Sequence, residues 1–101
     1  MKVHEYQAKA VLKEFGVRSE DLKQVVLHQA NGRILGQIAD RLGIERSRVT
    51  SVIERYGNTS SASLPIALDD AVRNGHISSG DLVLLGSFGG GLTWATSLVR
   101  W

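Results

Sequence analysis

The chain has 101 residues, of which 43% are hydrophobic and 22% charged, with 12 basic against 10 acidic side chains and no cysteine. This length and composition suit one small globular domain and exclude a largely disordered chain. The missing cysteines exclude disulfides, thiolate metal sites and a cysteine nucleophile within these residues.

The first half of the chain predicts a helix, a strand and a second helix. Residues 1–16 form the first helix, with Gly16 at its C-terminal end. Its apolar side chains recur at a period near 3.6 and share one face: Val3, Tyr6, Ala10, Leu12 and Phe15. The apolar run within Leu22–Leu27 predicts a buried strand, with one further helical turn as the alternative. A helix over residues 31–42 follows and ends at Gly43.

The second half predicts three strands and one helix. The β-branched run Val49–Ile53 indicates a strand. A helix follows a turn rich in small residues, and it either begins near Leu64 or bends at Pro65. Residues 81–85 give the strongest strand signal, and residues 92–101 predict a last strand beyond a glycine run. The order α-β-α-β-α-β-β predicts an α/β fold, a mixed sheet with helices packed on it, whose last two strands pair antiparallel.

Polar or glycine-rich segments follow three of these strands, beginning at His28, Gly57 and Phe88. If the strands are parallel, the segments meet at the C-terminal edge of the sheet, where α/β folds bind ligands. A histidine there would handle a proton and an asparagine would donate a hydrogen bond. The structural alternatives are that His28 is a satisfied polar residue, that Asn31 caps a helix and that the glycines form a turn. The spacing of the histidines predicts no metal site.

Five motifs carry a more specific signal: Leu27–Ile34, Arg55–Ser60, Gly80–Leu85, Phe88–Trp94 and Leu98–Trp101. Together they resemble the C-terminal part of a β-ketoacyl-acyl-carrier-protein synthase III, a thiolase-fold enzyme that starts fatty-acid synthesis. The resemblance runs from about Val17 to the end of the chain and covers only the last part of a family member. It implies a partial thiolase-like half-fold.

The resemblance also implies a condensation of an acyl-CoA with malonyl-acyl carrier protein. In the family a cysteine takes up the acyl group, while a histidine and an asparagine promote decarboxylation and hydrogen-bond the thioester oxygen. These two residues map onto His28 and Asn58, which are 30 positions apart. Gly90 would supply a backbone N–H to the acyl oxyanion hole, Asn31 would lie near the pantetheine arm, and Arg33 would dock the acidic carrier protein. The implied partners are acyl carrier protein and CoA or pantetheine thioesters, with no cofactor and no metal.

Three features depart from the family. The chain has no cysteine, so the implied nucleophile is absent. Gly32 stands where the family has a bulky aliphatic residue. Residues 1–17 instead resemble the N-terminus of a succinyl-CoA synthetase β subunit, an ATP-grasp enzyme. That resemblance predicts a chimera, with a helix of foreign origin over residues 1–17 and the thiolase-like segment over residues 18–101.

Two functions follow from these features. The first is a synthase-derived chain that keeps the half of the active site formed by His28 and Asn58. The second is an inactive module that forms homo-oligomers, because a lone half-fold exposes apolar surface and strand edges. No apolar run approaches the roughly 18–20 residues of a membrane span, and no basic stripe is present. We therefore expect a cytoplasmic protein that binds neither membrane nor nucleic acid.

Overall fold

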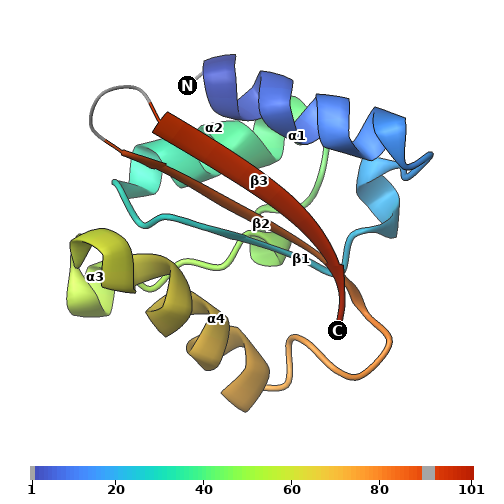
Figure 1. Ribbon diagram of the computed structural model, residues 1–101. Coiled ribbons are helices and arrows are strands. Elements are labelled where there is room, and N and C mark those ends of the chain that lie inside the picture. Colours follow the sequence, from blue (N-terminus) through green and yellow to red (C-terminus); the bar gives the residue numbers. More distant parts are fainter. Residues whose placement is uncertain (1, 90–92) are drawn as a thin grey trace.

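The computed structural model describes residues 2–89 and 93–101, with side chains from Ala8 onward. These residues form a three-stranded sheet in the order β1-β2-β3, with helices on both faces (Figure 1). β1 and β2 run parallel, and β3 pairs antiparallel with β2. The main elements, in chain order, are α1 Lys2–Glu14, β1 Gln24–Leu27, α2 Gly32–Leu42, α3 Ile53–Tyr56, α4 Ser63–Arg73, β2 Leu82–Gly89 and β3 Thr93–Arg100. The α/β fold, the mixed sheet and the antiparallel last pair are therefore confirmed.

Each face of the sheet has its own hydrophobic core. Val25 and Leu27 of β1 pack with Leu84 of β2 against α1 and α2. Val26 and Val83 point the other way and pack against α4. This alternation follows from the two-residue period of a strand. Because both faces are covered, every residue of β1 is buried, which explains the continuous apolar run in its sequence.

The ends of α2 and the start of α4 follow the predicted signals. Asn31 is the N-cap of α2, and its side-chain oxygen accepts a hydrogen bond from the Ile34 N–H at 2.9 Å. Gly43 ends α2 in the left-handed region, with φ of 70°. α4 begins at Ser63, so Pro65 lies in its first turn, where a missing N–H costs nothing. The helix therefore starts before the proline and does not bend at it.

α1 buries only part of the face predicted for it: Leu12 is buried as expected, whereas Ala10 and Phe15 are not. Ala8 and Leu12 enter the core, each 5% exposed, whereas Phe15 is 66% exposed and Ala10 is also exposed. Ala8 and Leu12 are one turn apart and so lie on one helical face. Phe15 lies beyond the last helical residue, where the chain turns away at Gly16, which has a φ of 66°. Two more side chains of the expected face lie outside the described ones: Val3 and Tyr6.

The strand expected at Val49–Ile53 is reduced to a single parallel bridge between its first residue and β1. The side chain of Gln29 takes the place of a longer ladder. Its Nε2 donates to the Thr50 carbonyl at 3.2 Å, and its Oε1 accepts from the Val52 N–H at 2.9 Å. The β-branched sequence does not become a strand because a buried amide satisfies backbone groups that a neighbouring strand would otherwise pair.

Candidate active site

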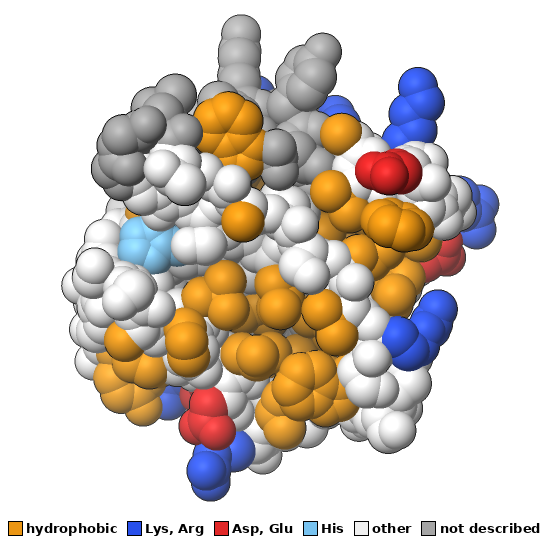
Figure 2. All heavy atoms as spheres, in the orientation of Figure 1, with side chains coloured by type: hydrophobic (Ala, Val, Ile, Leu, Met, Phe, Trp, Pro, Cys, Tyr) orange, Lys and Arg blue, Asp and Glu red, His pale blue; other side chains and the backbone are white. Residues whose placement is uncertain are grey.

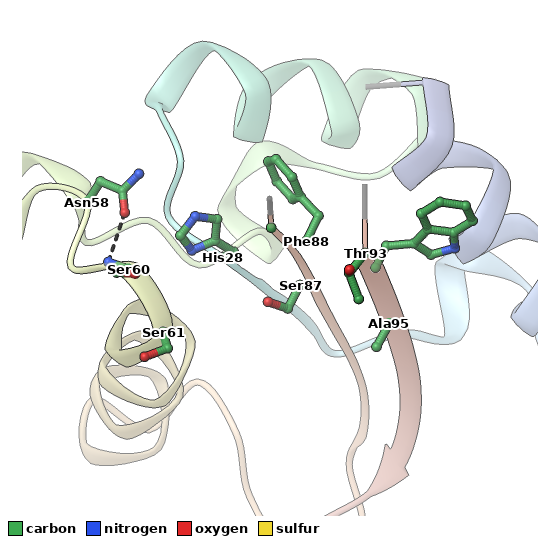
Figure 3. Close-up of a pocket in the computed structure, with 10 residues that line it drawn as sticks. His28, Asn58, Ser60, Ser61, Ser87, Phe88, Thr93 and Ala95 are labelled. Atoms are coloured by element: carbon green, nitrogen blue, oxygen red, sulfur yellow. Dashed lines mark hydrogen bonds between the residues drawn. The ribbon is translucent and has the colours of Figure 1, made fainter. Parts of the chain in front are cut away.

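A pocket of about 420 Å³ lies at the C-terminal ends of β1 and β2 (Figure 3). It brings together the three segments that the sequence singled out. Two of them follow the parallel strands β1 and β2, which end at the same edge of the sheet, and the segment from Gly57 reaches that edge after α3. The described residues that line it are His28, Asn58, Ser60, Ser61, Ser87, Phe88, Gly89, Thr93, Trp94 and Ala95. None of them is Asp, Glu, Lys or Arg, so the chemistry of the lining depends on neutral donors and acceptors and on one histidine.

His28 is held by the strand before it and by two side chains. Its backbone N–H donates to the Gly86 carbonyl at 2.9 Å and so extends the pairing of β1 with β2. Its ring Nδ1 lies 2.5 Å from the Ser63 Oγ. The ring also meets Phe88 edge to face, with centroids 5.4 Å apart. These contacts leave Nε2 as the ring nitrogen without a hydrogen-bond partner among the described residues.

Asn58 presents its amide group to the same pocket (Figure 3). Its Oδ1 accepts a hydrogen bond from the Ser60 N–H at 2.9 Å. Because the oxygen is engaged, the NH₂ group is the side of the amide that can donate to a ligand. Ser60 has a φ of 58°, a conformation that costs a non-glycine residue about 1–3 kcal/mol and that concentrates at functional sites.

Two other residues predicted for the site, Asn31 and Arg33, are not among the residues that line this pocket. Asn31 caps α2, as its structural alternative proposed, and Arg33 is exposed in the first turn of that helix. Arg33 makes no ion pair with any residue that the structure describes. Gly90, expected to contribute a backbone N–H, lies outside the described residues.

Two residues that the sequence analysis passed over support the site from behind. Ser63 is 1% exposed, and its Oγ accepts a hydrogen bond from the Gln29 N–H at 3.1 Å while contacting His28. Gln29 is fully buried, and its side chain also donates to the Leu27 carbonyl at 2.8 Å. No local signal marks Ser63 in the sequence, because its contacts are with His28 and Gln29, more than thirty positions earlier in the chain.

The shifted pKa values belong to surface ion pairs away from the pocket. A hydrogen bond from Arg46 lowers the pKa of Asp40, and the same contact raises the pKa of Arg46. Arg55 has a raised pKa because its side chain donates to Asp70. Within residues 2–89 and 93–101, no group of three or more histidine, cysteine or acidic residues is placed to hold a metal ion. None of the helices in these ranges has the length and apolar character of a membrane span.

Comparison with known proteins identifies relatives of this arrangement. The model of a family described as 3-oxoacyl-[acyl-carrier-protein (ACP)] synthase III C terminal matches residues 12–101. A β-ketoacyl-[acyl-carrier-protein] synthase III from Desulfotalea psychrophila is 55% identical over 91 residues, which are 90% of this chain and 28% of the relative. One from Rhodopirellula baltica is 48% identical over all 101 residues, which are 29% of the relative. The chain therefore spans less than a third of the length of these curated relatives.

A solved structure shows the same fold. The crystal structure of 3-oxoacyl-[acyl-carrier-protein] synthase III from Aquifex aeolicus superimposes with a TM-score of 0.96 at 43% identity, over 99% of this chain and 32% of that one. The chain thus has a thiolase-like α/β fold and forms part of one half of that fold.

These matches correct the interpretation of residues 1–17. The relative from R. baltica aligns with the whole chain and the A. aeolicus structure covers 99% of it, so the synthase likeness extends into α1. α1 also packs into the core that it shares with α2. The resemblance to a succinyl-CoA synthetase, and the chimera that it implied, are not supported. A short amphipathic helix is too common a pattern to identify its origin, because its apolar spacing recurs in unrelated proteins.

Proposed function

The chain belongs to the family of 3-oxoacyl-[acyl-carrier-protein] synthase III C-terminal domains, and on this premise we propose that it supplies the decarboxylating part of an acyl-condensing site. The observation that carries the proposal is that His28 and Asn58, 30 positions apart, line one pocket. Both present hydrogen-bonding groups to it. The named relatives are synthases, and their substrates come to this chain as part of the proposal.

In the proposed reaction a malonyl thioester enters the pocket. Its carboxylate leaves as CO₂, and the electron pair of the broken C–C bond forms an enolate whose negative charge lies largely on the thioester oxygen. His28 donates a ring N–H to that oxygen and Asn58 donates its amide N–H. One preorganised donor of this kind contributes about 2.7–4 kcal/mol to the transition state. Without an acyl acceptor, the α-carbon takes a proton and an acetyl thioester results.

The complete condensation needs an acyl group carried on a thiol. The chain has no cysteine, so this thiol comes from outside the 101 residues. We assign the Gly90 N–H to the acyl oxyanion hole, the surroundings of Asn31 to the pantetheine arm, and the exposed Arg33 to docking of the acidic carrier protein in the cytoplasm. No step calls for a cofactor.

Decarboxylation of malonyl-CoA tests the proposal directly. The chain should convert malonyl-CoA to acetyl-CoA faster than buffer, and His28→Ala and Asn58→Ala should each lower the rate about 10²–10³-fold. His76→Ala is the matched control, because His76 is exposed in the turn after α4. Circular dichroism establishes that each variant is folded. A wild-type rate equal to that of buffer, or a His28→Ala rate equal to the wild-type rate, contradicts the proposal.

A second candidate function is that of a self-associating module without activity. Trp94 in β3 and Trp101 just after it are 40% and 43% exposed. Figure 2 shows hydrophobic side chains gathered on the face between α4 and β3. Among the described strands, β3 is an edge with one side unpaired, and such edges invite pairing with another copy. Light scattering at high protein concentration tests this candidate, since a strict monomer contradicts it.

A further inference from the structure

We propose that Ser63 is a positioning residue that holds His28 in the tautomer with its proton on Nε2. Ser63 is the first residue of α4, and its Oγ lies between the Gln29 N–H, at 3.1 Å, and the His28 Nδ1, at 2.5 Å. Ser63 lies outside the five sequence motifs named above.

The single proton of the Ser63 hydroxyl group determines the tautomer of His28. The Ser63 Oγ accepts from the Gln29 N–H, which uses a lone pair and leaves the O–H free to donate. Ser63 is 1% exposed, so its proton needs an acceptor inside the protein. Among the described residues, His28 Nδ1 is the acceptor within hydrogen-bond distance. An Nδ1 that accepts a hydrogen bond carries no proton, and the neutral ring then has its proton on Nε2.

The contacts around Ser63 make this arrangement rigid. The side chain of Gln29 is itself bonded to the backbone at Leu27, Thr50 and Val52, so the N–H that orients Ser63 is fixed. On the other side of the ring, Phe88 meets His28 edge to face at an interplanar angle of 79°. The Nε2–H is thereby left as the donor on the side of the ring that has no partner among the described residues.

This tautomer is the one that the decarboxylation requires, because only an Nε2–H donates to an oxygen placed in the pocket. That catalytic role rests on the proposed function. The tautomer itself rests only on the buried hydroxyl, and it can be measured in the chain without any substrate.

Nitrogen NMR of the histidine rings tests the proposal. In the ¹⁵N-labelled chain at about pH 8.5, roughly two units above the usual histidine pKa, long-range ¹H–¹⁵N correlations distinguish a protonated ring nitrogen from an unprotonated one. His28 should show a single Nε2–H form, whereas the exposed His76 should show a mixture. Ser63→Ala should convert His28 to a mixture, and Ser63→Thr, which keeps the hydroxyl, should retain the single form. Ser79→Ala, in the exposed turn after α4, is the matched control and should change nothing.

The rate of malonyl-CoA decarboxylation gives a second measurement. Loss of a partner that orients a histidine costs about 10–100-fold in metal sites. We expect a fall of this size in kcat for Ser63→Ala, with little change in KM and recovery in Ser63→Thr.

Each outcome bears on the proposal. An Nδ1–H form of His28 in the wild-type chain overturns it, even if Ser63→Ala does not fold. A single Nε2–H form that persists in folded Ser63→Ala also overturns it. If the tautomer follows Ser63 but the wild-type chain decarboxylates no malonyl-CoA, the positioning role stands and the proposed function fails.

Discussion

The substitution Gln29→Leu tests whether one buried amide replaces the hydrogen bonds of a strand. The Gln29 side chain makes three hydrogen bonds with the backbone, at 2.8 Å to the Leu27 carbonyl, at 3.2 Å to the Thr50 carbonyl and at 2.9 Å from the Val52 N–H. Leucine has a similar size but makes none of them. Because the segment Val49–Ile53 does not form a strand, the Val52 N–H and the Thr50 carbonyl have the Gln29 side chain as their partner. In Gln29→Leu these two backbone groups lose that hydrogen bond.

The expected loss can be worked from these contacts. Each buried group left unpaired costs about 1–3 kcal/mol, so the Val52 N–H and the Thr50 carbonyl together cost about 4 kcal/mol. Burying a leucine at a fully buried position returns about 2 kcal/mol. The net fall in the free energy of unfolding is therefore about 2 kcal/mol. Against a total of about 5–15 kcal/mol for a small domain, this fall is large enough to measure.

Urea unfolding followed by circular dichroism measures the difference. The matched control is Gln37→Leu, the same chemical change at an exposed position of α2, where the effect should stay within about 0.5 kcal/mol. If Gln29→Leu unfolds at the same urea concentration as Gln37→Leu, the hydrogen bonds from the Gln29 amide to these backbone groups do not stabilise the chain. The explanation given for the missing strand would then be refuted.

Three further predictions concern stability and are measured by urea unfolding. Gly36→Ala should stabilise the chain by about 0.5–1 kcal/mol. The new Cβ would come within 3.1 Å only of the Arg46 guanidinium, the far end of an exposed side chain that can move aside. A loss of stability would show that the Arg46 side chain does not move aside. Gly86→Ala should cost about 1–3 kcal/mol, because its Cβ would lie 2.7 Å from the Leu27 Cδ2 in the packed core, and an unchanged midpoint would contradict this packing. Asp40→Asn should be less stable than the wild type near neutral pH, since the hydrogen bond from Arg46 lowers the pKa of Asp40. That difference is fully present above about pH 4 and should disappear as the pH falls through the lowered pKa; a difference that persists at about pH 2 would show that it does not come from the ionised carboxylate.

Local sequence was sufficient for most of the fold. The end of α2 at Gly43 and the buried run of β1 are set by neighbouring residues and were predicted correctly. For Asn31 and Pro65 the sequence left two alternatives open, and the structure has the helix cap and the first-turn position. The prediction of a strand at Val49–Ile53 was wrong because the conformation of this segment depends on a residue far away in the sequence. Its backbone partners come from Gln29, more than twenty positions earlier, and no local propensity reports a side chain that reaches the segment from elsewhere.

The candidate site also contains residues that local sequence predicted and a residue that it did not. His28 was predictable because it follows β1, which ends at the C-terminal edge of the sheet. The strand expected before Asn58 does not form, and Asn58 reaches the same pocket after α3. The part played by Ser63 was not predictable from its neighbours. It depends on α4 bringing its first residue beside the end of β1, a contact between positions 35 apart in the chain.

The register between β1 and β2 links the packing of the sheet to the position of His28 in the site. Leu27 pairs with Gly86, and the Leu27 Cδ2 occupies the space that a side chain at Gly86 would need. A glycine is a poor residue for a strand interior, so its presence in β2 is explained by this close approach. A slip of one residue would set a larger side chain against Leu27 and turn every side chain of β1 to the opposite face. Because the His28 N–H continues the ladder onto the Gly86 carbonyl, the register that Gly86 permits also fixes where the His28 ring stands relative to Ser63.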